Sequence, residues 1–144
     1  MNRKLVMAAT TLILLGCAGQ NSKLTDGAAS DREALESYVL QRAAPLLAPG
    51  ERLSVEITDL DRAGEREPWR PGLGNTRVVR DVYPARIVLG FKLMKADGSM
   101  ARDGTRTLAG LPVAGAARYG EDPLRYERAL LDDWLERELR RAAQ

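Results

Sequence analysis

Histidine is absent from this chain of 144 residues, and its only cysteine is Cys17. Without histidine the chain lacks the commonest general base and the commonest transition-metal ligand. A single cysteine cannot form an internal disulfide or the several ligands of a zinc–sulfur site. Any catalysis would have to use Asp, Glu, Lys, Tyr, Ser or Thr. This inventory predicts a protein that is not an enzyme and holds no cofactor.

The one long apolar run, Leu5–Leu15, has 11 residues, whereas a membrane-spanning helix needs about 20. Arg3 and Lys4 precede the run, so residues 1–16 read as a secretory signal peptide. The run ends in Leu14–Cys17, which resembles a bacterial lipobox. We therefore expect Cys17 to carry the lipid that anchors the protein to a membrane.

Ordinary signal cleavage after Gly19 is the alternative, and it would leave a soluble periplasmic protein. Ala18 stands where many lipoproteins retained in the inner membrane have aspartate. This difference favours the periplasmic face of the outer membrane as the location.

The net charge of +2 comes from 22 basic and 20 acidic residues. Arg3 and Lys4 would leave with the signal peptide, so the mature protein is expected to be neutral. A neutral chain has no electrostatic reason to bind nucleic acid. Residues 17–29 have the composition of a flexible tether, and residues 30–144 have the length of a single domain.

Apolar periodicity predicts a helix at each end of this domain, over Asp31–Ala44 and from Asp122-Pro123 onward. Between the helices, β-branched and alternating segments predict strands, and Asp97-Gly98 predicts a hairpin turn. The expected strands are Leu53–Thr58, Thr76–Val82, Ile87–Met94 and Met100–Leu108. This order predicts an α+β fold in which two helices cover one face of an antiparallel sheet of about four strands.

Asp59, Asp61 and Glu65 form the densest acidic group, at the end of the first expected strand. Their carboxylates could bind Mg²⁺ or Ca²⁺, or act as general acid and base. The alternative is a turn in which the carboxylates accept backbone amides and nearby arginines neutralise them.

Trp69 and Arg86 are the candidate residues for binding a partner. Trp69 lies in a polar loop and could be an exposed anchor, or it could fold back onto the sheet edge. Arg86 could bind a carboxylate ligand, or pair with an acidic neighbour such as Asp81 or Glu56.

Three blocks of sequence, in order, resemble the domain of unknown function 3016 family: Asp59–Glu65, Tyr83–Ile87 and Asp122–Trp134. The resemblance extends from about Leu24 to Arg140, with Arg62 where the family has leucine. It implies a bacterial exported protein with one domain, and it brings no established activity.

These features predict a non-enzymatic envelope lipoprotein that binds another envelope component, a protein. Two other hypotheses stay open. One is a carboxylate-dependent hydrolase, with or without a divalent metal, that uses Asp59, Asp61 and Glu65. The other is a structural stress-resistance lipoprotein with no specific ligand.

Overall fold

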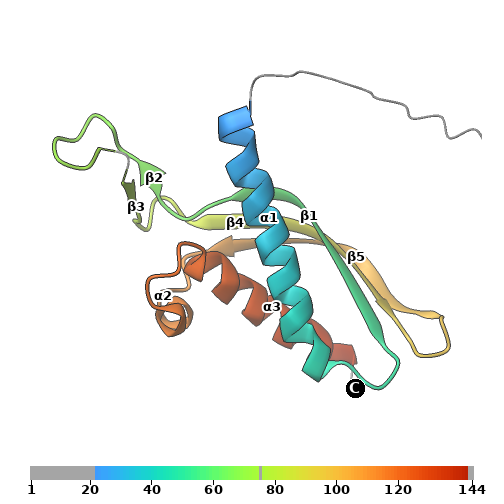
Figure 1. The fold of residues 1–144 in the computed structure, drawn as a ribbon. Helices are drawn as coiled ribbons and strands as arrows, with labels where there is room; N and C mark the ends of the chain where they lie inside the picture. The colour runs from blue at the N-terminus through green and yellow to red at the C-terminus, as the bar shows by residue number, and fades with distance from the viewer. Residues whose placement is uncertain (1–21, 75, 143–144) are drawn as a thin grey trace, which may run out of the picture.

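The structure is a computed structural model that describes residues 22–74 and 76–142, so Cys17 and the expected signal peptide lie outside the described residues. Long helices stand at both ends of this part of the chain, with strands and short helices between them (Figure 1). The elements are α1 (Ser22–Ala43), η1 (Ala44–Leu46), β1 (Arg52–Asp61), β2 (Glu65–Arg66), β3 (Arg77–Val78), β4 (Ala85–Met94), β5 (Met100–Gly110), α2 (Val113–Ala116), η2 (Ala117–Tyr119) and α3 (Arg125–Ala142).

The main sheet has three antiparallel strands in the order β1-β4-β5, so β4 is central. As predicted, a turn at Asp97-Gly98 joins β4 to β5. Within this turn the Gly98 amide donates to the Lys95 carbonyl at 3.0 Å. A register shift between Ile57 and Asp59 forms a bulge in β1. Beyond the bulge, Asp59 and Asp61 are exposed while Leu60 packs against the core.

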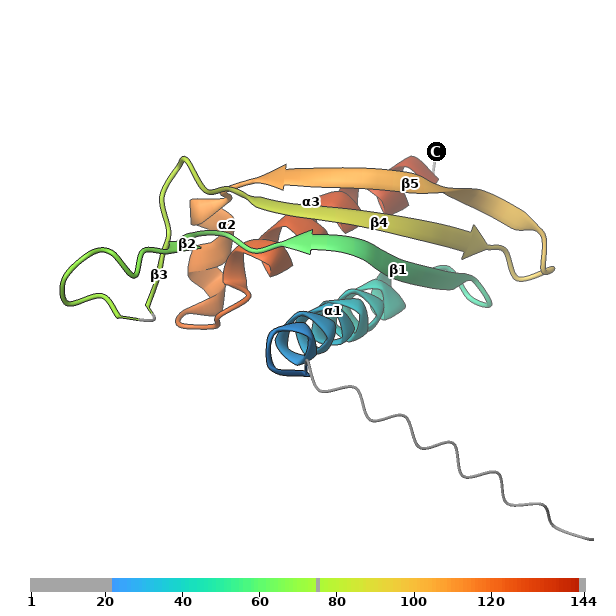
Figure 2. The same ribbon diagram turned by 90° about the horizontal axis from the view of Figure 1, so that it is seen from above.

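Alternation along β4 separates a buried face from a partly exposed one. Ala85, Ile87, Leu89, Phe91 and Leu93 are buried, whereas the residues between them are exposed or partly buried. Leucines and other apolar side chains of α1 and α3 join the buried face in one core cluster. Both long helices therefore cover the same face of the sheet (Figure 2), which confirms the predicted α+β class.

The prediction of a fourth strand in the main sheet was wrong. In the segment expected to form it, only β3 is extended, and β3 pairs with β2 in a separate two-stranded sheet. A turn in which the Tyr83 amide donates to the Arg80 carbonyl at 2.9 Å ends this segment before it reaches β4. Residues 64–74 and 76–83 instead form an arm that projects beyond the three-stranded sheet (Figure 1).

Two helix boundaries also differ from the sequence expectations. α1 begins at Ser22 rather than Asp31, so residues 22–29 of the expected tether are helical, whereas residues 17–21 lie outside the described residues. Between the last expected strand and the last expected helix, the chain also forms α2 and η2. Small residues allow this, because a Cβ built on Gly115 would lie 3.2 Å from the Cβ of Ala129 on α3.

Candidate functional site

The three acidic candidates are divided between two environments. On the exposed side of the sheet, the Asp59 carboxylate forms an ion pair with Arg86, with Oδ2 2.5 Å from Nη1. Asp61 and Glu65 line a cleft of about 440 Å³ at the base of the arm, together with Asp31. Arg62, Arg66 and Arg77 line the same cleft, so its carboxylates stand among an equal number of guanidinium groups.

Arg86 forms an ion pair, as one of the two interpretations predicted, but with a different partner. Cross-strand pairing places Arg86 opposite Asp61 and Val88 opposite Asp59. Asp59 and Arg86 are therefore diagonal neighbours on one face of the sheet, which is within reach of an arginine side chain. Neither Asp81 nor Glu56 is its partner among the described ion pairs.

Trp69 is exposed over 69 % of its surface and does not fold back onto the sheet edge. It lies at the third position of a turn in which the Arg70 amide donates to the Glu67 carbonyl at 3.0 Å. Pro68 occupies the second position, where its fixed φ angle favours this type of turn. The arm thus carries its only tryptophan outward on a short, defined turn.

Beneath this turn, the buried carboxylate of Glu67 is held by two arginines. Arg70 and Arg80 each donate to Glu67 Oε2 at 3.2 Å, although they lie on opposite sides of the loop. At the base of the arm, the Gly64 amide donates to the Tyr83 carbonyl at 2.9 Å. The arm is thus held both at the turn that carries Trp69 and at its base.

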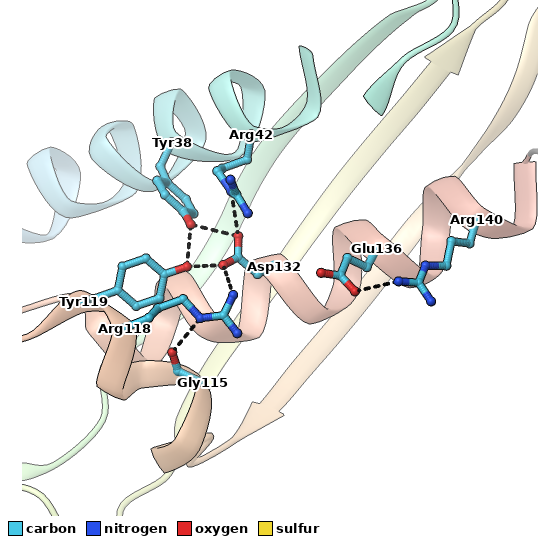
Figure 3. A network of polar contacts seen from close by, with 8 residues as sticks. All are labelled: Tyr38, Arg42, Gly115, Arg118, Tyr119, Asp132, Glu136 and Arg140. Atoms are coloured by element: carbon cyan, nitrogen blue, oxygen red, sulfur yellow. Dashed lines mark hydrogen bonds and ion pairs between the residues drawn. The ribbon is translucent and has the colours of Figure 1, made fainter. Parts of the chain in front are cut away.

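A polar cluster that no sequence pattern predicted surrounds Asp132 on α3 (Figure 3). Its side chain is only 4 % exposed, yet it reaches four partners from two other segments, α1 and η2. Tyr38 donates to Oδ1 at 2.8 Å and Arg42 Nε approaches the same oxygen at 3.4 Å. Tyr119 donates to Oδ2, and Arg118 lies 3.5 Å from that oxygen.

Burial and hydrogen bonding raise the pKa of Tyr38 far above its ordinary value. Burial, followed by the hydrogen bond to Asp132, also raises the pKa of Tyr119. Both phenols therefore stay protonated and act as donors. The negative charge of Asp132 raises the pKa of Arg42, so its guanidinium is firmly cationic.

Next to this cluster lies a cleft of about 330 Å³ between the end of α1, η1 and α3. Leu46, Leu135 and Leu139 give it an apolar lining, and the charged residues around them are Arg42, Asp132, Glu136 and Arg140. Glu136 and Arg140 pair with each other at 3.3 Å across one helical turn. We call this cavity the α1–α3 cleft.

One signal in the sequence could have pointed to this cluster. Asp132 immediately follows Leu131 and stands three residues before Leu135, so it borders the apolar stripe of the predicted C-terminal helix. A carboxylate in that position needs partners when the helix packs. The identity of the partners depends on tertiary structure, because Tyr38 and Tyr119 lie in other elements.

Within residues 22–74 and 76–142, no helix is long and apolar enough to cross a bilayer. The same part of the chain brings no three Cys, Asp or Glu side chains together in a geometry that would hold a metal ion.

Comparison with curated proteins and with solved structures gave no significant match. Residues 19–137, which are most of the chain, match the family described as "Protein of unknown function (DUF3016)". This match confirms the resemblance carried by the three sequence blocks. The chain therefore belongs to the DUF3016 family.

Proposed function

We propose that this chain is a non-enzymatic, lipid-anchored binding module of the bacterial cell envelope, and that it binds an envelope protein through the arm. The observation that supports this most is the exposed indole of Trp69. Tryptophan is enriched among the residues that dominate protein–protein binding energies. An exposed tryptophan on a braced, projecting turn fits that use.

The surroundings of Trp69 indicate the chemistry of the partner surface. Arg70 and Arg80 are partly exposed beside the turn, and Val82 is an exposed apolar residue farther along the arm. Arginine is also enriched at the centres of interfaces. A complementary partner would offer an apolar pocket for the indole with carboxylates at its rim.

The acidic residues support the non-enzymatic part of the proposal. Asp59 is neutralised by Arg86, and Asp61 and Glu65 share their cleft with three arginines. Guanidinium groups beside these carboxylates compete with a divalent cation for them. Calorimetric titration of the protein with Mg²⁺ and Ca²⁺ tests this point. Saturable heat that Asp61→Asn abolishes would favour the hydrolase instead.

Chemical crosslinking in intact cells, followed by recovery of the tagged full chain, tests the role of the arm. We expect the Trp69→Ala variant to recover at least tenfold less of a specific crosslinked protein than wild type does. Val113→Ala is the matched control, because Val113 is an exposed apolar residue on α2, away from the arm. Equal recovery of the same partners with Trp69→Ala and wild type would overturn the proposed interface.

The anchor is tested separately by metabolic labelling with palmitate. Loss of label from the Cys17→Ser variant is the expected result. Label retained by that variant would refute attachment at Cys17. Fractionation of the two membranes then tests the proposed location at the periplasmic face of the outer membrane.

A further inference from the structure

The α1–α3 cleft combines an apolar lining with the guanidinium group of Arg42 at one end. Its volume of about 330 Å³ lies within the range of small-molecule sites, roughly 300–1,000 Å³. Leu135 and Leu139 lie one helical turn apart on α3, and Leu46 faces the same cavity from η1. Leu46 is 52 % exposed, so apolar surface remains in contact with water.

The charge excess arises around Asp132. Two guanidinium groups, those of Arg42 and Arg118, share this single carboxylate. Glu136 is already paired with Arg140, so it does not balance the second arginine. The guanidinium groups around Asp132 therefore outnumber its carboxylate by one, and of the two only Arg42 lines the cleft.

Arg42 is the arginine of this pair that lines the cleft. Its contact with Asp132 is made by Nε, at 3.4 Å. Among residues 22–74 and 76–142, its two terminal amino groups have no hydrogen-bond partner. An arginine with both terminal amino groups available can bind a carboxylate bidentately.

We propose that the α1–α3 cleft binds an anionic single-chain amphiphile, with its alkyl chain against Leu46, Leu135 and Leu139 and its carboxylate on Arg42. An alkyl chain suits this lining because it has no polar groups to satisfy. A peptide would bring backbone N–H and C=O groups next to the leucines, where they would lose their hydrogen bonds to water. The proposal concerns a site apart from the arm, so each can fail without the other.

Photolabelling of the full chain in phosphatidylcholine nanodiscs tests the proposal. The probe is decanoate carrying a diazirine, and labelled peptides are identified by mass spectrometry. We expect saturable labelling of the peptides that contain Leu46 and Leu139. Decanoate should compete with the probe at least tenfold better than decanol, because only decanoate has the carboxylate.

Two variants locate the site. Arg42→Gln should weaken labelling at least tenfold, and Arg52→Gln on β1 is the matched control that should leave it unchanged. Leu46→Asp should also abolish labelling, and its exposed position makes the substitution compatible with folding. Circular dichroism checks that each variant is folded.

Other outcomes overturn the proposal. Equal competition by decanol removes the role of Arg42 as a carboxylate ligand. Labelling spread along the chain, or unchanged in folded Leu46→Asp, removes the cleft as the site. Stronger displacement by an apolar peptide with a free C-terminus than by decanoate would assign the cleft to a protein segment.

Discussion

The hydroxyl oxygens of Tyr38 and Tyr119 lie 2.7 Å apart, although 81 positions separate the two residues in sequence. Their rings meet edge to face, with centroids 6.1 Å apart. Both hydroxyls also contact the carboxylate of Asp132, one at each oxygen. The pair thus connects α1 to η2 and both of them to α3.

Removing one phenol from this cluster should destabilise the fold. Tyr119→Phe leaves an oxygen of the buried Asp132 without its donor, a loss of about 1–3 kcal/mol in the free energy of unfolding. Urea denaturation measures the change. Tyr126→Phe is the control, because it removes a hydroxyl outside the cluster and keeps a ring beside Arg125. Equal losses in the two variants would contradict a special role for the cluster.

The double variant Tyr38→Phe/Tyr119→Phe should lose less stability than the sum of the single variants. The two residues share one carboxylate and contact each other, and contacting residues usually couple by about 0.5–3 kcal/mol. A double-mutant cycle in urea gives the coupling free energy. A value near zero would show that the two hydrogen bonds act independently.

Glu127 should make stability depend on pH. Its side chain is buried, Oε1 accepts the Ala63 amide at 2.7 Å, and Oε2 has no partner among the described residues. Burial, opposed by this amide and by Arg62 and Arg77, raises the pKa of Glu127 above its ordinary value of 4.5. Its contribution is therefore fully present below pH 4.5 and is lost as pH rises through the folded-state pKa.

The Glu127→Gln variant checks this sign. Glutamine keeps the acceptor for Ala63 but cannot ionise, so the variant should gain stability relative to wild type between pH 4.5 and neutrality. Urea denaturation across this range gives the difference. Parallel pH profiles would refute the assignment.

Gly64 should be difficult to replace, because it has φ +81° and an added Cβ would lie 2.7 Å from the Val78 carbonyl oxygen. Gly64→Ala should cost more than about 1 kcal/mol in unfolding free energy. Gly72→Ala separates the two causes, since Gly72 has φ +83° but no atom within 4 Å of the added Cβ. A larger fall in Tm for Gly64→Ala is the expected result, and equal falls would contradict it.

Two leucines on the long helices should respond differently to truncation. Leu131 is 0 % exposed, so Leu131→Ala should lose about 2–5 kcal/mol by leaving a cavity. Leu40 is 40 % exposed, and Leu40→Ala should change stability by about 0.5 kcal/mol or less. Chemical denaturation compares the pair directly. Similar losses would mean that α1 packs more tightly than its exposure indicates.

Much of the fold could be predicted because local patterns and tertiary packing agree. The alternation from Ile87 to Met94 marks the central strand, and Asp97-Gly98 fixes the hairpin that follows. The last helix was expected from Asp122-Pro123 onward, and α3 begins at Arg125, just after the Asp122 carboxylate accepts the Leu124 amide at 2.7 Å. In each case the residues that carry the signal are neighbours in sequence.

The rest depends on contacts between distant segments. Val78 and Val79 favoured a strand of the main sheet, but Val79 packs against the core while β3 pairs with β2. The Gly- and Ala-rich segment before α3 forms α2, in which Ala116 is buried and Gly115 lies close to Ala129 of α3. The Asp132 cluster joins residues from α1, η2 and α3, so local sequence patterns could not reveal it.

The two arginines that hold Glu67 have a thermodynamic consequence for the arm. A loop that becomes ordered only on association loses conformational entropy at that moment, and this loss weakens binding. Here the turn that carries Trp69 is already fixed by Pro68, by the Glu67–Arg70 backbone hydrogen bond and by the buried carboxylate below it. A surface prepared in this way can associate with little entropic penalty from its own backbone.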